Sequence, residues 1–174
     1  MTVELGVVQA VDAKSYGRPG QRTFHLRVIG ANSEAADLVL EKQHLVALSM
    51  AFEEILSQLG YESSSVLPPS LNFPARPQYE FHVGRMTVGF HAPDATIALT
   101  VHEFGEDDGS QATLSFRLTQ DQCAALRLRL NEIISAGRPI CRLCGQPVDL
   151  EGHVCFRLNG HSQQPIPDTD QDAS

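Results

Sequence analysis

Apolar and polar residues alternate in six stretches of the chain, which predicts two successive groups of three strands. In the first half the alternation indicates strands over residues 3–11, 23–29 and 37–41. In the second half it indicates strands over residues 80–91, 95–104 and 112–118. We therefore expect six strands in a mostly antiparallel sheet.

A helix is predicted after each group of strands. Apolar residues at three- and four-residue steps indicate one helix over about 42–59, ended by Gly60. Thr119 and Gln122 have the spacing of a capping box, and the helix that follows them runs to about Ala136. At an offset of 78 residues the two helical regions share six identities. These are Leu40, Ala47, Leu48, Glu54, Ile55 and Ser57, which align with Leu118, Ala125, Leu126, Glu132, Ile133 and Ser135.

The predicted fold class is α+β, with two βββα repeats forming a mostly antiparallel sheet with two packed helices, followed by a small C-terminal zinc knuckle. The repeats span about 3–60 and 80–137 within a core of residues 1–137, and a linker or long surface loop covers 61–79. The knuckle spans 138–161, and a polar, acidic tail over 162–174 is expected to be disordered. An internal duplication accounts for the repeated order, and two similar helices of independent origin are the alternative.

The strongest chemical signal is a cluster of metal-ligand residues near the C-terminus. Cys141 and Cys144 form a CxxC pair followed by Gly145, and His153 and Cys155 follow within fifteen residues. Three thiolates and one imidazole form a complete tetrahedral ligand set for Zn²⁺. The alternatives are His161 as the fourth ligand, a metal-free cluster, or a disulfide between Cys141 and Cys144.

The predicted zinc is structural, because four protein ligands leave no open position for water or substrate. Metal binding supplies roughly 10 kcal/mol or more of folding free energy to a small module of this kind. Cys123, the fourth cysteine, falls on the apolar stripe of the second helix, and we expect it in the core.

Composition narrows the class of protein. The chain has 174 residues and a formal net charge of −8, so nucleic acid is a disfavoured partner. No run of 18 apolar residues occurs, and the N-terminal residues lack the pattern of a signal peptide. These features favour a cytoplasmic protein without a membrane segment.

Four motifs resemble those of an uncharacterised bacterial family of unknown function, best known from actinobacteria. They are GRPGQRTF at 17–24, LEKQ at 40–43, FHVGRMTVG at 81–89, and CRLCGQPVDLEGHVCFRLNG at 141–160. Arg142 and Phe156 stand where family members usually have proline, and neither position is a metal ligand. The resemblance implies a shared fold and zinc site, and it implies no activity.

We therefore expect a zinc-containing binding or adaptor protein with a protein partner, and we identify no catalytic residue. One alternative is a zinc- or His-dependent hydrolase with a site between the repeats, which would need one of the scattered histidines beside a carboxylate in a deep pocket. Another is a nucleic-acid-associated regulator that uses arginines flanking the knuckle. These are Arg127, Arg129, Arg138 and Arg142, and the simpler interpretation of them is the solvent face and end of the second helix. Arg22 is expected in a tight hairpin, paired with Glu41, rather than in an anion site.

Overall fold

The computed structural model describes residues 1–18, 20–62, 65–105 and 113–136, together with the pairs 143–144, 153–154 and 163–164. The chain divides into two compact units, Met1–Ile133 and Ile134–Ser174. The strands of the larger unit are β1 (Thr2–Val7), β2 (Ala10–Tyr16), β3 (Thr23–Ile29), β4 (Ala35–Leu40), β5 (Tyr79–His91), β6 (Thr96–Glu103) and β7 (Thr113–Leu118). The helices are α1 (Lys42–Gln58) and α2 (Gln120–Ala136).

The seven strands that the described residues form lie in one sheet, in the order β1-β7-β6-β5-β4-β3-β2. Four neighbouring pairs are antiparallel, and the β1–β7 and β4–β5 pairs are parallel. The predicted α+β class with a mostly antiparallel sheet and two helices is therefore confirmed.

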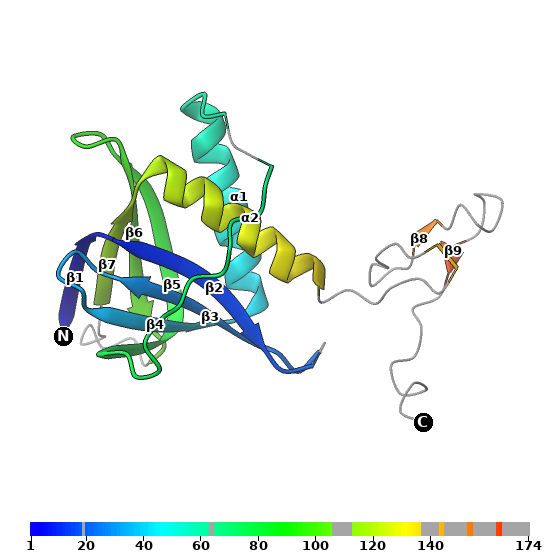
Figure 1. Cartoon of the computed structure of the whole chain (residues 1–174), viewed down its shortest axis with the longest axis horizontal. Helices are drawn as coiled ribbons and strands as arrows, with labels where there is room; N and C mark the ends of the chain where they lie inside the picture. Colours follow the sequence, from blue (N-terminus) through cyan, green and yellow to red (C-terminus); the bar gives the residue numbers. More distant parts are fainter. Residues whose placement is uncertain are drawn as a thin grey trace. The chain divides into compact units, whose positions relative to one another are not determined.

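The two edge strands, β1 and β2, are consecutive in the chain, and the sheet curves so that one segment serves both edges (Figure 1). Only Val8 and Gln9 separate them. The Val8 N–H donates to the Arg117 carbonyl on β7, at 3.0 Å, and the Gln9 N–H donates to the carbonyl of Ile29, the last residue of β3, at 2.8 Å. Main-chain hydrogen bonds thus link the first strand group to the second through this bend.

The expected single strand over 3–11 is wrong, because the chain changes partners inside it. The β1–β7 pairing shifts register between Glu4 and Val7, and Gly6 has a φ of +66°, a conformation that favours glycine. After this irregularity Val8 is buried in place of Val7, which is only half-buried. Strand β2 then continues to Tyr16, beyond the predicted end of the strand, so the sheet has seven strands rather than six.

The helix boundaries follow the sequence closely. Gly60 ends α1 with a φ of +65°, and the Tyr61 N–H donates to the Leu56 carbonyl at 3.0 Å. The Thr119–Gln122 capping box is present: the Gln122 N–H donates to Thr119 Oγ1 at 3.1 Å, and the Thr119 N–H donates to Gln122 Oε1 at 2.9 Å.

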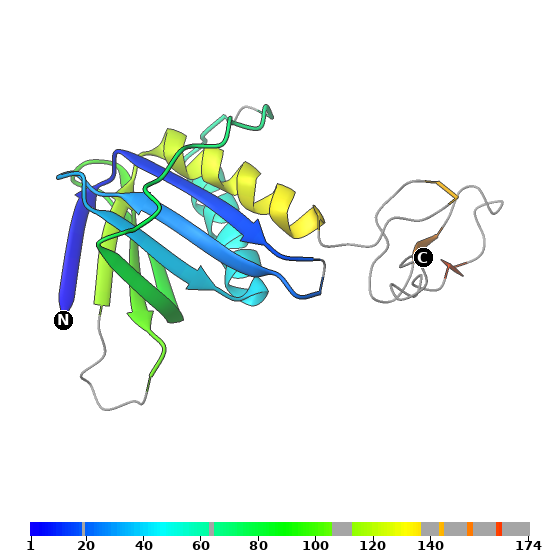
Figure 2. The ribbon, with the colours of Figure 1, turned by 60° about the horizontal axis from the view of Figure 1, so that its bottom comes forward.

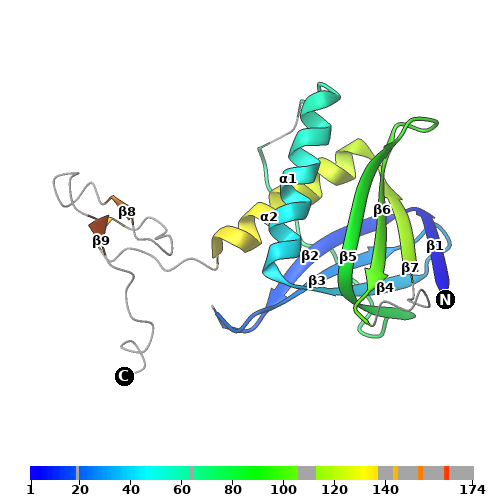
Figure 3. The same ribbon diagram turned by 180° about the vertical axis from the view of Figure 1, so that it is seen from behind.

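The two helices cross on the same side of the curved sheet (Figures 1 and 3). Ser49 Oγ on α1 donates to Asn131 Oδ1 on α2 at 2.6 Å, so the helices are in contact at that point. The apolar residues between the helices and the sheet are almost fully buried. The largest of these side chains are Phe52, Phe81, Phe116, Leu26, Leu38, Leu45, Leu48, Ile97, Leu99, Leu114, Leu118 and Leu126.

The predicted linker over 61–79 is a surface loop that packs on the core, up to Tyr79 at the start of β5. Figure 2 shows the described part running from the end of α1 across α2 and β2 to β5. The Tyr61 hydroxyl donates to Asp121 on α2, and Gln78 Oε1 accepts a 2.7 Å hydrogen bond from the Ala35 N–H. Both ends of the loop are therefore held by side-chain contacts.

The smaller unit contains two short strands in its described residues. β8 (His153–Val154) and β9 (Gln163–Gln164) form an antiparallel pair, and β9 lies in the stretch predicted as an acidic tail. Most of the predicted knuckle and tail lies outside the described residues. Among the described helices, none combines the length and the apolar character needed to cross a membrane.

Cys123 lies in the core, as its place on the apolar stripe predicts, and its side chain is fully buried. Burial raises the pKa of its thiol to about 12, because a thiolate would lose its hydration there. Since the thiolate is the reactive form, we expect Cys123 to resist alkylation in the folded protein and to react after unfolding. Peptide mass mapping after iodoacetamide treatment, with and without urea, measures this. Rapid labelling of Cys123 in the folded protein would contradict it.

Candidate functional site

The predicted zinc ligands lie mostly outside the residues that the structure describes. Cys141 and Cys155 are outside them, as is the alternative ligand His161, while Cys144 belongs to the described pair 143–144 and His153 begins β8. Within the described residues, no three His, Cys, Asp or Glu side chains form a metal-binding group. Because Cys141 and Cys155 lie outside the described residues, the zinc site stays a prediction.

One of the scattered histidines does lie beside a carboxylate. Asp37 on β4 lies opposite Arg27 on β3 and diagonal to His25 on the same outer face, and His25 Nδ1 lies 2.9 Å from Asp37 Oδ1. Arg27 Nε is 3.5 Å from the other Asp37 oxygen, and the Tyr16 ring contacts the His25 ring edge-on. Asp37 is 8% exposed, and the Arg27 cation with the contact to His25 offsets the cost of burying its charge.

This histidine–aspartate pair lacks the pocket that a hydrolase needs. The cavity beside Asp37, under Phe73 and Pro74, measures about 10 Å³, which is room for one water molecule at most. Substrate pockets are typically several hundred Å³. The arrangement therefore fits a polar brace between β3 and β4 better than a reaction site.

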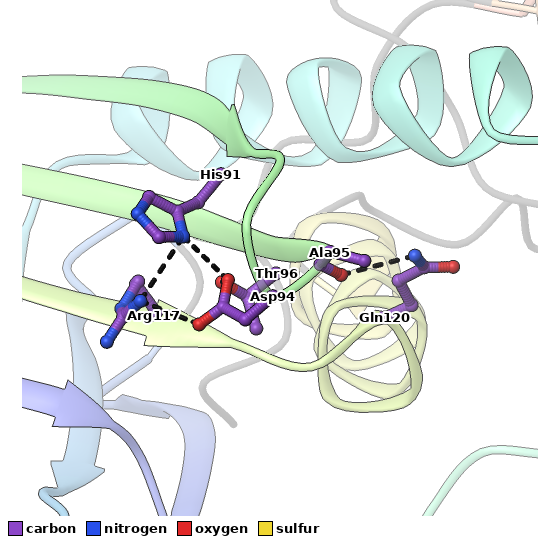
Figure 4. Close-up of polar contacts among 6 residues, drawn as sticks. All are labelled: His91, Asp94, Ala95, Thr96, Arg117 and Gln120. Carbon is purple, nitrogen blue, oxygen red and sulfur yellow. Dashed lines mark hydrogen bonds and ion pairs between the residues drawn. The ribbon is translucent and has the colours of Figure 1, made fainter.

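A second polar cluster lies at the turn between β5 and β6, and the sequence patterns did not indicate it (Figure 4). Asp94 Oδ1 accepts hydrogen bonds from His91 Nδ1 and Thr96 Oγ1, each at 2.6 Å, and Arg117 Nη1 on β7 lies 2.6 Å from Asp94 Oδ2. Gln120 at the start of α2 donates to the Ala95 carbonyl at 3.2 Å. The cluster thus joins the β5–β6 turn to β7 and α2.

Arg129 is the largest departure from the sequence prediction, which placed it on the solvent face of the second helix. It is 7% exposed, and its Nε lies 3.1 Å from Asp12 Oδ1 on β2. Its Nη1 lies 2.7 Å from Glu132, and its Nη2 donates to the Pro68 carbonyl of the surface loop. The partner of Arg129, Asp12, lies 117 positions away in the sequence, and no local pattern around Arg129 indicates it.

Asp12 completes this contact on the loop side. Its Oδ2 accepts a 3.0 Å hydrogen bond from the Leu71 N–H. Arg129 therefore holds the loop at the Pro68 carbonyl, and Asp12 holds it at the Leu71 N–H. We call this pair of residues, with its two loop contacts, the Arg129 clamp.

The predicted pairing of Arg22 with Glu41 is wrong. The guanidinium of Arg22 donates to the Ile133 carbonyl near the end of α2, at 3.1 Å, and stacks 5.0 Å from the Phe24 ring centre. Glu41 instead belongs to the start of α1, where its N–H donates to His44 Nδ1 at 3.1 Å. Arg22 thus neutralises the carbonyl end of α2 rather than forming an anion site.

An apolar groove of about 160 Å³ lies beside the Arg129 clamp. It lies between the start of β2, the loop and α2. Its apolar lining comes from Val11, Pro68, Pro69, Leu71, Ala125 and Leu126. Gln122 also lines it, and its Nε2 donates to the Val8 carbonyl at 2.9 Å. This groove is too small for most ligands, since a large part of the space between β2 and α2 is covered by the loop.

Fold and sequence together define an α+β protein with a curved, mostly antiparallel sheet and two helices. Residues 4–155 match the family model described as a protein of unknown function (DUF3090), and the chain belongs to that family. The matched range includes all four predicted zinc ligands. The comparisons with curated proteins and with solved structures found no match.

We expect Arg129→Ala to lower the free energy of unfolding by about 3–5 kcal/mol, because it leaves the Asp12 carboxylate without its buried partner. Arg127→Ala, two residues earlier on α2, is the matched control and should change stability by less than about 0.5 kcal/mol. Urea unfolding followed by circular dichroism compares the two. Equal losses for both variants would show that the Arg129 clamp contributes no more than an ordinary surface arginine.

The Asp94 cluster predicts a specific acid dependence. Hydrogen bonds from Thr96 and His91, with the charge of Arg117, lower the pKa of Asp94 from 3.8 to about 2. A lowered pKa in the folded state contributes stability above the unfolded value, and this contribution is lost as pH falls from about 4 through about 2. Asp94→Asn should therefore be less stable than wild type at pH 5, and the difference should shrink by pH 2. Urea titrations at several pH values measure it, and a constant difference would contradict it.

Proposed function

We propose that this chain is a binding or adaptor protein whose segment 138–161 folds around one structural zinc ion. The observation that carries this proposal is the donor set itself: Cys141, Cys144, His153 and Cys155, within fifteen residues. Three thiolates and one imidazole satisfy zinc fully, and this combination is typical of structural rather than catalytic sites. A small module built in this way commonly presents a surface to another protein.

The described part of the smaller unit is compatible with this ligand set. His153 begins β8, so its backbone is extended. Side chains two apart on an extended segment project to the same side, which is the arrangement that a His-x-Cys pair needs to bind one ion. The ion would fix the fold of the segment. Reduced thiols of this kind also favour a cytoplasmic location.

We also infer that the larger unit arose by internal duplication. Strands β4 and β7 begin 78 positions apart, as do α1 and α2, and each helix has 17 residues. The pairing registers correspond as well: Leu26 lies opposite Leu38 in the first group, and Leu99 lies opposite Phe116 in the second. Independent origin of two such groups would leave unexplained why β4 with α1 and β7 with α2 share one spacing and one register.

Two other functions receive less support. The hydrolase has a candidate in the His25–Asp37 pair, but the adjoining cavity of about 10 Å³ holds no substrate. The nucleic-acid regulator depended on an arginine flank, and Arg129 belongs to the core rather than to that flank. A binding protein with a protein partner therefore remains the function that the described residues favour.

Metal analysis tests the zinc proposal directly. Protein purified without a metal-affinity tag should contain one zinc per chain, and Cys144→Ser should lose it, because three ligands hold zinc far more weakly than four. Cys123→Ser is the matched control: it removes a core thiol and should keep the zinc. Mass spectrometry of the intact protein under native conditions, with elemental analysis, measures both. Wild-type protein without metal, even after refolding with zinc, would refute the proposal.

A further inference from the structure

The two strand groups place β2 and β5 at corresponding positions in the sheet. Each forms cross-strand rows that continue through two further strands. On the core side these rows are Val11–Val28–Ala36 and Ala13–Leu26–Leu38 in the first group, and Met86–Val101–Leu114 and Val88–Leu99–Phe116 in the second. Phe90 extends the second set, opposite Ile97. A side chain on β5 can therefore be compared directly with its counterpart on β2.

Corresponding side chains differ sharply in exposure. On β2, Val11 is 9% exposed and Ala13 is 4% exposed. On β5, Met86 and Val88 are only half-buried, and Phe90 is 44% exposed. The row opposite them on β6 is fully buried, so these three apolar residues lie on the core side of the sheet where its cover ends.

The neighbouring helices differ in the same way. α1 lies beside β5 on the side away from β6 (Figures 3 and 4). Ala125 on α2 is half-buried, whereas Ala47 at the corresponding position of α1 is exposed. We call Met86, Val88 and Phe90 with Ala47 the β5–α1 face.

The counterpart of this face, between β2 and α2, is partly covered by the chain itself. Pro68, Pro69 and Leu71 line the apolar groove there together with Val11 and Ala125, and the Arg129 clamp holds the loop in place. The covering segment carries two adjacent prolines and contains no charged residue from Ser65 to Asn72. The fold thus already uses one such segment to complete one of its two corresponding faces.

We propose that the β5–α1 face binds an extended, proline-containing apolar segment of another protein, in the way that the β2–α2 face holds residues 66–71. This inference rests on the proposed binding function and names its partner class. Such a segment loses little conformational entropy on binding, because proline restricts its backbone beforehand. Its apolar side chains would cover Val88 and Phe90, whose exposed area favours burial.

The face differs from its counterpart in one respect that sets the strength of binding. Ala51 and Thr87 occupy the positions that correspond to Arg129 and Asp12. The β5–α1 face therefore lacks the charged clamp, and it holds its partner by apolar contact. Binding should be reversible and weaker than the intramolecular contact, which also benefits from covalent connection.

A peptide with the sequence of residues 65–72, SVLPPSLN, is a probe of the required chemistry. Added to isotope-labelled full-length protein, it should shift the amide signals of Met86, Val88, Phe90 and Ala47 in a saturable way. Phe90→Ser and Ala47→Glu, both at exposed positions, should each weaken binding about fivefold or more. Phe104→Ser, at an exposed apolar position after β6 and outside this face, is the matched control and should bind as wild type does. A peptide with both leucines changed to serine should bind at least as weakly as the face variants do.

Three results would overturn the proposal. One is the absence of shifts at millimolar peptide. Another is shifts confined to Val11 and Ala125, which would mean that the peptide only displaces the chain's own loop. The third is a concentration-dependent shift of the β5 signals without peptide, together with a dimer in sedimentation, which would make a second copy the occupant. Zinc content is measured separately, so failure here leaves the zinc module of the proposed function standing, and loss of zinc there leaves the peptide result standing.

Discussion

The larger unit depends on one bend in its first strand. Because β1 and β2 are separated by only two residues, the same stretch of chain pairs with β7 on one side and with β3 on the other. The sheet must curve to allow this, and the curvature creates the concave side on which α1 and α2 cross. Gly6 permits the required local conformation, and the buried Val8 carries the apolar row across the bend.

The surface loop covers part of the apolar surface that the curved sheet and the helices leave exposed. A sheet of this shape presents its apolar rows to two helices, but each helix covers only part of the space beside a bent strand. On the β2 side the chain fills the remainder with a proline-containing segment and holds it with a buried ion pair. Proline suits this task because it needs no N–H partner where the loop lacks a neighbouring strand. On the β5 side no such segment is seen in the described residues, and Phe90 stays partly exposed.

The elements that the sequence predicted well are those with local signals. The helices begin and end within a residue or two of their predicted bounds, since a capping box and a glycine mark them, and Cys123 is buried because the apolar stripe of α2 includes it. The errors share a different cause. The break at Val8–Gln9, the burial of Arg129 and the place of Arg22 each depend on a partner far along the chain, which no local pattern encodes.

The candidate sites divide in the same way. A ligand set within fifteen residues can be recognised from spacing alone, so the zinc hypothesis comes directly from the sequence. The His91–Asp94–Arg117 cluster forms only when β5, β7 and the β5–β6 turn come together. The alternation of residues along one strand does not predict which other strands will lie beside it. The β5–α1 face could be recognised only by comparing exposure at corresponding positions in two strand groups.

The parallel pairing of β1 with β7 has a consequence for how the protein is made. Thr2 lies opposite Thr113, so β1 leaves the ribosome long before β7, the strand whose pairing satisfies its edge. Until then an apolar strand with free main-chain groups is open to other chains. Long-range pairing of this kind slows folding, because the chain loses the entropy of closing a long loop before the strand contacts can form. Synthesis of the nascent chain, rather than stability of the finished fold, is thus the stage at which this architecture is most vulnerable to aggregation.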